Sequence, residues 1–323
     1  MEIRKYKAGD EEHILELFEL AFSKKLTKEF WLWRFKNNPF LDTEMINLMW
    51  EEDILAGHYA VSAIEIIVDH KKVLASLSGT TMTHPSFQGK GIFSSLSNAL
   101  YKRVRDELGV NMVFGFPNKN SHYGLVKKLG WKDVAVIPNF SLNINDLKKV
   151  ESTTTMRIIE SFETRHSDFI SRTITDLGFS VYVNRSEKYL NWRYQDCPIN
   201  DYSCFEILKD GTCVGIAITK IFIPGPSSNP EVDIVELFCA ADLKMLQEVL
   251  MHINHFYSKQ GLADSNLNLW MSLFDPRHLL LERLGFSLGM PLTYMGAKEF
   301  TKGFDMVSEY KNWYISMGDS DIF

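Results

Sequence analysis

The sequence lacks any long hydrophobic run. No stretch approaches the roughly 18 consecutive apolar residues that a membrane-spanning helix needs. Residues 1–5 carry charged side chains in place of the apolar core of a secretion signal. These absences remove helical membrane spans from the expected architecture. They favour a cytoplasmic protein that has no membrane partner.

Cysteine is scarce, with 4 residues in the chain, none of them arranged as Cys-x-x-Cys. The zinc and redox motifs that depend on such pairs are therefore absent, and we expect no metal site. We expect buried, reduced thiols at all of these positions, which are Cys197, Cys204, Cys213 and Cys239.

The chain also lacks an excess of basic residues. It has 35 Lys and Arg against 41 Asp and Glu, which gives a net charge of −6 and an isoelectric point near 5.9. This balance argues against a nucleic-acid partner, because such proteins present dense positive charge. A local basic position such as Lys90 still suits one small phosphorylated ligand. The 45% hydrophobic and 13% aromatic content indicates a globular chain, and 323 residues suffice for two domains.

What the sequence does contain is a strand, a glycine-containing loop and a helix in immediate succession. Residues 75–83 have the β-branched and small side chains of a strand, and Pro85 ends it by withholding its N–H group. A helical period follows over residues 92–108. The loop carries Gly89 and Gly91, so free backbone N–H groups and the positive end of a helix dipole meet there. This arrangement predicts a phosphate site.

The glycine spacing excludes two common phosphate loops. No glycine stands five residues before a Gly-Lys-Ser/Thr, and no third glycine completes a dinucleotide fingerprint. Gln88 and Gly91 instead fit the first two fixed positions of Arg/Gln-x-x-Gly-x-Gly/Ala, the acetyl-CoA signature of the GNAT acyltransferase superfamily. The chain resembles this family, whose lead-in x-Pro-x-x-Arg/Gln is also present at residues 84–88. Phe93 departs from the third fixed position.

The order of predicted elements is similar to the GNAT fold as well. An antiparallel meander is expected over residues 46–68, with a weak break near Ser62. A strand at residues 111–116 and a short helix at residues 121–128 follow the loop and its helix. Gly130 then caps the short helix.

An internal repeat is the second informative feature of the sequence. Trp192 and Pro198 repeat Trp33 and Pro39 at a constant offset, since 192 − 33 = 159 and 198 − 39 = 159. Two glycine positions recur later in the same order, at offsets of 158 and 155 residues: Gly57 with Gly215, and Gly130 with Gly285. In the second copy no Gly-x-Gly separates the matching strand from its helix.

The predicted fold class is α/β (α+β), with two tandem GNAT-like domains. Each would be a mixed, mostly antiparallel twisted sheet flanked by helices. We expect an acyl-CoA-binding domain at residues 1–150 and a Ser/Thr-rich linker at 151–155. A degenerate GNAT-like domain at residues 156–300 and an extension at 301–323 would follow. Only the first copy is expected to bind the cofactor.

The resemblance implies a set of donor-binding residues. The backbone of Met82, Thr83 and His84 would pair with the pantetheine arm of coenzyme A and polarise the thioester. The loop would wrap the pyrophosphate through Gln88, Gly89, Lys90, Gly91, Ile92, Phe93 and Ser94. Asn120 matches the family's asparagine at the start of the next helix, where its alternative role is an ordinary N-cap.

The acid and the base are implied less directly. Val126 stands where many family members have a tyrosine acid, and Tyr123, about one helical turn earlier, is the predicted catalytic residue. Its alternative role is packing. Four side chains are candidates for the base, as is a water relay: His58, Glu65, His84 and His122.

The resemblance implies an acetyl-CoA-dependent N-acyltransferase that moves an acetyl group to an amine of a small molecule or peptide. Acetyl-CoA would be a co-substrate, no metal would take part, and the protein would be a monomer or a homodimer. The alternative is a catalytically weak acyl-CoA-binding or scaffold protein of the same fold. The aromatic segment at residues 30–39 fits either core packing or an acceptor groove.

Overall fold

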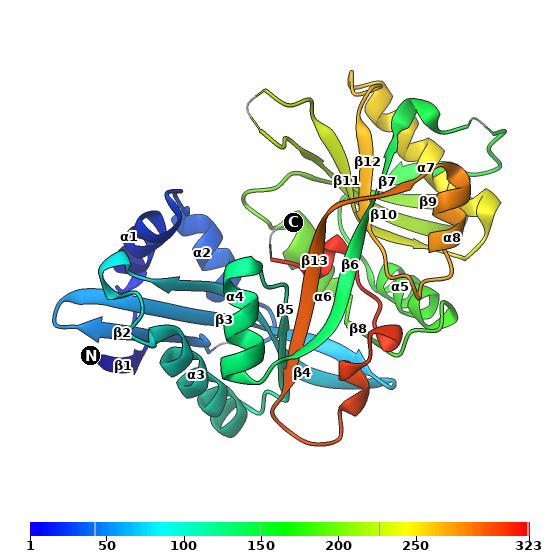
Figure 1. Cartoon of the computed structure of the whole chain (residues 1–323). Helices are drawn as coiled ribbons and strands as arrows, with labels where there is room; N and C mark the ends of the chain where they lie inside the picture. Colours follow the sequence, from blue (N-terminus) through cyan, green and yellow to red (C-terminus); the bar gives the residue numbers. More distant parts are fainter. Residues whose placement is uncertain (42, 149, 226, 322) are drawn as a thin grey trace. The chain divides into compact units, whose positions relative to one another are not determined.

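The computed structural model describes residues 1–41, 43–148, 150–225, 227–321 and 323 (Figure 1). The chain divides into two compact units, each of which contains both strands and helices. The first unit consists of Met1–Ala135 and Tyr294–Ser308, and the second of Val136–Thr293 and Glu309–Phe323. The predicted α/β class is confirmed, with a large, mostly antiparallel sheet flanked by helices.

The first unit is built on a sheet whose early strands are antiparallel and whose strand β5 runs parallel to β4. Its strands are β1 (Glu2–Lys5), β2 (Ile46–Glu51), β3 (Ile54–Val68), β4 (Lys71–Thr83) and β5 (Met112–Gly115). Its helices are α1 (Glu11–Phe22), α2 (Lys28–Phe35), α3 (Ile92–Leu108) and α4 (Lys119–Tyr123), with a 3-10 turn at Pro85–Phe87 and a π-helical turn at Gly124–Lys128.

This sheet separates two hydrophobic cores. Because side chains alternate along a strand, β3 directs Tyr59 and Val61 to the core under α3, and Ala60 to the core under α1 and α2. Figure 1 shows α3 on one side of the sheet and α1 and α2 on the other. The aromatic segment of α2 packs inward, with Trp31 and Phe35 buried, so core packing accounts for these two rings.

Two local predictions in the first unit have clear outcomes. The helix predicted over residues 92–108 is confirmed as α3, which ends at Gly109 with a φ of 69°. The break expected near Ser62 is wrong, because β3 continues through it and Ser62 pairs with Leu77 of β4. The Ser62 side chain is buried, and a small hydroxyl does not interrupt the ladder.

The second unit has a similar order of elements, with the short strand β8 in addition. An antiparallel series, β9 to β11, leads into α7, and β12 then runs parallel to β11. Its strands are β7 (Thr155–Ile158), β8 (Val181–Val183), β9 (Tyr202–Lys209), β10 (Thr212–Phe222), β11 (Glu231–Cys239) and β12 (Asn266–Trp270). Its helices are α5 (Thr164–Asp176), α6 (Glu187–Leu190), α7 (Leu243–Ser258) and α8 (His278–Leu284), with short helical turns at Ile144–Asp146, Asn191–Gln195, Tyr310–Asn312 and Met317–Asp319.

Two strands pass from one unit to the other, and they are β6 (Lys132–Asn143) and β13 (Ser287–Glu299). The late residues of β6 pair with β12 of the second unit. The late residues of β13 return to the first unit, where Gly296 lies opposite Gly115 of β5. A segment far along the sequence therefore pairs with β5 in the first unit.

The compact units differ from the division expected at residues 150 and 155. The first unit ends at Ala135, and the chain returns to it at Tyr294. Pairing between strands, and not sequence position, defines the units. The Ser/Thr-rich segment expected to be a linker is anchored on α7. Thr153 N–H and the Thr154 hydroxyl donate to the Glu248 carboxylate at 3.0 and 2.8 Å.

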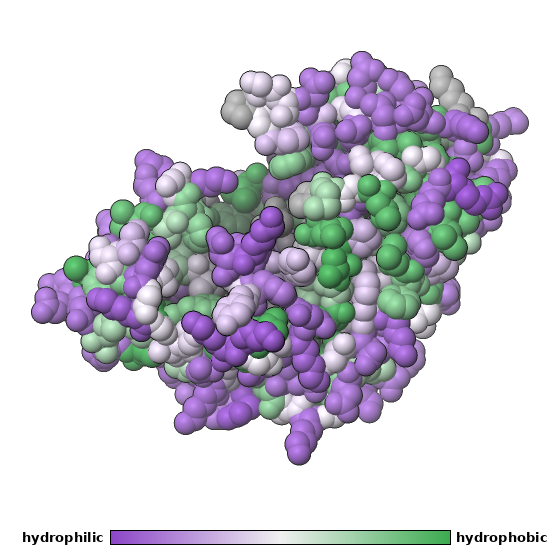
Figure 2. All heavy atoms as spheres, in the orientation of Figure 1, coloured by the Kyte–Doolittle hydropathy of each residue, from purple (hydrophilic) through white to green (hydrophobic). Residues whose placement is uncertain are grey.

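Hydrophilic side chains cover much of the face shown in Figure 2. Among the hydrophobic residues of β13, Leu288, Met290 and Leu292 are 57%, 77% and 47% exposed. Their spacing of two residues places them on one side of the strand. No helix in the described parts of the chain is long and apolar enough to cross a bilayer.

Candidate functional site

The predicted phosphate loop lies between β4 and α3 and has the backbone that its glycines suggest. Gly89 and Gly91 have φ values of 77° and 76°, in the left-handed region that glycine adopts without strain. A Cβ built on either residue would meet no atom within 4 Å. The glycines are therefore needed for backbone conformation, and the space around them is open.

The N–H groups at this loop are available to a ligand. Among the described residues, those of Gln88 through Phe93 donate to no protein acceptor. Gly91 is the N-cap of α3 and supplies no side-chain cap. The ammonium of Lys90 lies 4.6 Å from the centre of the Phe87 ring, which keeps a positive charge beside the loop. These features suit a phosphate group.

The matching position in the second unit is built differently. Asp242 is the N-cap of α7, and its carboxylate accepts a hydrogen bond from Met245 N–H at 2.8 Å. A negative side chain thus already satisfies one donor at this helix end and repels another anion. The second helix end is therefore unsuited to phosphate.

A wedge opens between β4 and β5 next to the loop. The two strands pair only at Ser76–Leu77 with Val113–Phe114, while β4 continues to Thr83 and β5 ends at Gly115. The strands stay close as far as Ser78, because a Cβ on Gly115 would lie 3.1 Å from the Ser78 Cβ. Beyond Ser78, the edge of β4 that faces away from β3 has no strand partner among the described residues.

The backbone of β4 alternates between its two edges. His84 N–H donates to the Ala56 carbonyl of β3 at 3.0 Å. In an antiparallel ladder every second residue directs its N–H and C=O at the partner strand, so Met82 faces β3 as well. Thr81 and Thr83 face the open edge. Of the three backbone contacts expected for the pantetheine arm, the structure therefore presents Thr83 to the wedge, and it turns the N–H groups of Met82 and His84 toward β3.

A buried hydroxyl network lies at the base of the wedge. The Tyr59 hydroxyl contacts Ser78 Oγ at 2.9 Å and the Tyr101 hydroxyl at 2.7 Å, and Trp131 Nε1 donates to Tyr101 at 3.1 Å. Burial raises the pKa of Tyr59 to about 12. These phenols remain protonated at neutral pH, so they stabilise the base of the wedge by hydrogen bonds without carrying charge.

Phe93, which departs from the family signature, has its own place in this packing. Its ring packs edge-on against Tyr59, with centroids 6.1 Å apart and an interplanar angle of 90°. Gly124 lies next to the Phe93 ring and leaves room for it, because a Cβ built on Gly124 would lie 3.0 Å from Phe93 Cε1. Sequence reasoning missed Gly124, although a glycine inside a predicted short helix was the available signal.

Helix α4 places Asn120 and Tyr123 at the surface. Asn118, and not Asn120, is the N-cap: its Oδ1 accepts from Asn120 N–H at 2.9 Å and from Ser121 N–H at 3.1 Å. The Asn120 side chain is therefore not used as a cap. Tyr123 is 67% exposed, whereas Val126 in the following π-helical turn is half-buried.

The four candidate bases lie in separate surroundings. His58 is fully buried on β3, with Nδ1 2.9 Å from the Thr80 carbonyl. His84 Nδ1 accepts Ser86 N–H at 3.2 Å. The other two candidates lie elsewhere in the unit.

His122 Nε2 lies 2.5 Å from Asp133 Oδ1, and its ring stacks on Tyr294 at 4.5 Å. Glu65 lies opposite Leu74, along the part of β4 that precedes the wedge. The structure therefore brings His58 and His84 to the wedge region of β3 and β4, and it does not bring Glu65 there.

The space between β11 and β12 in the second unit is taken up by the chain itself. Beyond their short parallel pair, the Leu237 carbonyl accepts from Arg277 at 2.7 Å and from the Tyr314 hydroxyl at 3.0 Å. Both side chains line the small cavity that remains there, together with Val235 and Trp270. This space contrasts with the open edge of β4 in the first unit.

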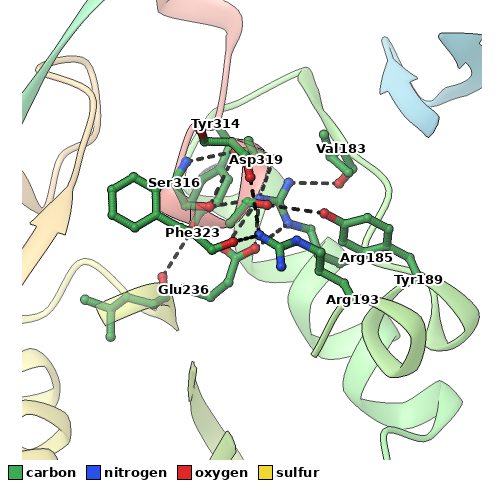
Figure 3. Close-up of polar contacts among 12 residues, drawn as sticks. Val183, Arg185, Tyr189, Arg193, Glu236, Tyr314, Ser316, Asp319 and Phe323 are labelled. Atoms are coloured by element: carbon green, nitrogen blue, oxygen red, sulfur yellow. Dashed lines mark hydrogen bonds and ion pairs between the residues drawn. The ribbon is translucent and has the colours of Figure 1, made fainter. Parts of the chain in front are cut away.

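A buried polar network holds residues 314–319, the segment that carries Tyr314, in place (Figure 3). The Arg185 guanidinium lies 3.1 Å from Glu236 and 2.8 Å from Asp319, and it donates to Ser316 Oγ at 3.0 Å. The Tyr194 hydroxyl adds a hydrogen bond to Glu236 at 2.8 Å. Every member is buried, so the network anchors residues 314–319 on β11.

Within the described residues, no three His, Cys, Asp or Glu side chains are placed to hold a metal ion. The site consists of backbone donors, an open strand edge and neutral hydroxyl groups. Such a site suits a phosphorylated, elongated ligand that presents a carbonyl.

Comparison with known proteins agrees with this description. Residues 2–134 match the family model described as "Acetyltransferase (GNAT) domain", a span that holds the loop, the wedge and α4. A search of curated proteins finds no match.

Solved structures share the fold over most of the chain. A GCN5-related N-acetyltransferase from Anabaena variabilis has a TM-score of 0.72 at 11% identity, and the match covers 92% of this chain and 72% of that one. A probable N-acyltransferase from Enterococcus faecalis gives 0.69 at 14% identity, over 92% and 72%. Saccharomyces cerevisiae N-myristoyltransferase with bound myristoyl-CoA gives 0.58 at 10% identity, over 92% and 82%. At such low identity the likeness shows the GNAT fold alone.

Proposed function

We propose that this protein is an acetyl-CoA-dependent N-acyltransferase that transfers an acetyl group to an amine of a small molecule or peptide. The observation that carries the proposal is the juxtaposition, in one unit, of a glycine loop at the N-terminus of α3 with the open edge of β4. The loop offers N–H groups for a pyrophosphate. The strand edge offers Thr81 and Thr83 to an extended amide-bearing arm.

When bound, acetyl-CoA supplies a thioester whose acetyl carbon forms an amide bond with the acceptor nitrogen as its C–S bond breaks. The nitrogen gives up a proton and the departing sulfur accepts one. Backbone N–H groups of β4 orient the carbonyl and stabilise the negative charge that develops on its oxygen. Tyr123, exposed on α4, is the proposed proton donor to sulfur, and Asn120 beside it is a proposed cofactor contact.

We infer that the second unit is a degenerate copy that binds no coenzyme A. Its helix N-terminus is capped by the Asp242 carboxylate. Its inter-strand space is lined by Arg277 and Tyr314, both bonded to the Leu237 carbonyl. A phosphate there would meet the like charge of the Asp242 carboxylate, and pantetheine would have to displace buried hydrogen bonds to the Leu237 carbonyl, which opposes binding.

The comparisons support acyl transfer as the class of reaction. Two of the similar structures are described as an N-acetyltransferase and a probable N-acyltransferase, and a third is an N-myristoyltransferase with its long-chain acyl-CoA bound. We propose acetyl as the group transferred. Rates with acetyl-CoA and with myristoyl-CoA, measured side by side, test that choice.

Turnover separates this function from its alternative. Purified full chain is incubated with acetyl-CoA and a panel of amines, free thiol is followed over time, and products are checked by mass. The proposal predicts amine-dependent thiol release and a product heavier by one acetyl group. Coenzyme A binding without amine-dependent thiol release would instead identify a weak acyl-CoA-binding or scaffold protein. That alternative is supported by Val126, which stands where many GNAT proteins have a tyrosine.

A further inference from the structure

His58 is a fully buried imidazole with one polar contact among the described residues. It lies on β3 at 0% exposure, and its Nδ1 is 2.9 Å from the Thr80 carbonyl. Because a carbonyl oxygen only accepts, Nδ1 carries the proton. The other ring nitrogen, Nε2, is buried and has no hydrogen-bond partner within the described chain.

Thr80 is the extra residue of a β-bulge in β4. Tyr59 lies opposite Thr81 and Ala60 lies opposite Gly79, so Thr80 has no opposite residue on β3. A bulge frees one residue from the ladder and re-aims the backbone around it. In this bulge the Thr80 carbonyl is held by the His58 side chain.

The orientation of that carbonyl fixes the next N–H group. A trans peptide is planar, so the carbonyl of Thr80 and the N–H of Thr81 point in opposite directions. The Thr80 carbonyl points toward His58, and Thr81 faces the open edge of β4. The ladder turns Thr81 to the open edge, and the His58 contact holds the peptide group that carries this N–H in its orientation.

We propose that His58 is a positioning residue that, through the Thr80 carbonyl, aims the Thr81 N–H at the carbonyl oxygen of a bound acyl donor. The inference rests on the proposed function, since it needs an acyl donor in the wedge. It makes the Thr81 N–H the group that stabilises the developing oxyanion.

The energetics of burial support a specific role for this side chain. A buried imidazole with one unpaired nitrogen is less favourable than an apolar side chain of similar volume. Burial lowers the pKa of His58 to about 4, against the opposing effect of its bond to Thr80. The ring is therefore neutral at neutral pH, and its polar contribution is one hydrogen bond to the bulge.

Substitutions can distinguish the role of Nδ1 from that of Nε2 in the His58 ring. The amide nitrogen of Asn lies near the position of Nδ1, whereas that of Gln lies near Nε2. We expect His58→Asn to keep the Thr80 bond and to retain kcat within about threefold. His58→Gln and His58→Leu lose that bond, and we expect kcat to fall on the order of 10- to 100-fold with the Kd for coenzyme A within about threefold. Ser76→Ala is the control, because it removes a buried bond to the Met112 carbonyl (3.2 Å) from the paired part of β4.

A second readout does not depend on turnover or on equal stability of the variants. The amide proton of Thr81 is followed by NMR as acetyl-CoA or coenzyme A is added. We expect acetyl-CoA to give a larger downfield shift than coenzyme A in wild type and in His58→Asn, and we expect this difference to disappear in His58→Leu.

The outcomes distinguish this inference from the proposed function. A wild-type protein that neither binds coenzyme A nor releases thiol would overturn both. An active wild type matched by His58→Leu in rate and in the Thr81 shift would overturn the positioning role alone. His58→Asn as slow as His58→Leu would also overturn it, because Nε2 would then be the working atom.

Discussion

Phe93 and Gly124 fit each other: the ring of Phe93 occupies the space that a Cβ on Gly124 would need, with a separation of only 3.0 Å. Gly124 has ordinary helical dihedral angles (φ −65°, ψ −42°), so the backbone itself does not require glycine. Phe93 stands where the acetyl-CoA signature that the loop resembles has a small residue. It keeps the first turn of α3 packed beside the loop.

This fit predicts a non-additive pair of substitutions. Gly124→Ala should lower the free energy of unfolding by about 1 kcal/mol, because the methyl group displaces the Phe93 ring. In a Phe93→Leu background the same change should be neutral or slightly stabilising, since alanine is the better helix former. Urea unfolding of the four proteins measures the coupling. Strictly additive values would show that the two residues do not interact.

The loop predicts a contrast between the two ends of α3. Gly91→Glu should raise the Kd for coenzyme A by more than about 100-fold, because a carboxylate would stand at the anion site. Gly109→Glu is the matched control: Gly109 also has a positive φ, 69° against 76°, and its Cβ would likewise meet no atom within 4 Å.

Both variants should lose about 1–2 kcal/mol of stability from backbone strain, with slightly more at Gly109, because a negative charge is unfavourable at a helix C-terminus. Thermal melting of both variants measures the loss of stability from backbone strain, and titration with coenzyme A measures the loss of affinity. Equal affinity of the two variants for coenzyme A would make the loop an ordinary turn.

Tyr123 is predicted to act in proton transfer. Its hydroxyl is exposed on α4, so Tyr123→Phe should leave stability and donor affinity nearly unchanged. The maximal rate should fall at least about tenfold, since general acids typically contribute on the order of 10²–10⁴. Steady-state kinetics with a saturating amine measure this effect. An unchanged kcat would assign the proton to water and leave Tyr123 a surface residue.

The second unit carries a predicted pH dependence at Asp233, which is 2% exposed on β11. Burial raises the pKa of this carboxyl to about 6 from 3.8, against the opposing effects of Lys220 and Asn268. The folded state therefore holds the proton more tightly than the unfolded state, and this contribution to stability is lost as pH rises from about 4 to 6.

Asp233→Asn, which cannot ionise, should gain stability relative to wild type over that same pH range, by about 1–3 kcal/mol. Denaturant unfolding of both proteins at several pH values gives the difference directly. A difference that does not change with pH would mean that Asp233 titrates normally.

Local patterns in the sequence predicted the parts of the site that depend on neighbouring residues. The loop glycines, the start of α3 at Ile92 and the strand before them follow from turn chemistry and helical period. The cap of α4 was misplaced by two residues, because Asn118 and Asn120 are both suitable caps and only the backbone decides between them.

Features that depend on distant residues could not be read in this way. The return of β13 to pair with β5 joins residues such as Gly296 and Gly115, and no local pattern specifies that pairing. The bulge at Thr80 and its contact with His58 depend on the register of two strands. The occupation of the second inter-strand space by Tyr314 likewise requires the folded chain.

We propose that one unit of this chain, and only one, binds an acyl-CoA. Isothermal titration of the full-length chain with coenzyme A tests it most directly. We predict a single class of sites with a stoichiometry of one per chain, lost in Gly91→Glu and retained in Gly109→Glu. Two equivalent sites, or no measurable binding by the wild-type protein, would show that the first unit is not the single acyl-CoA site.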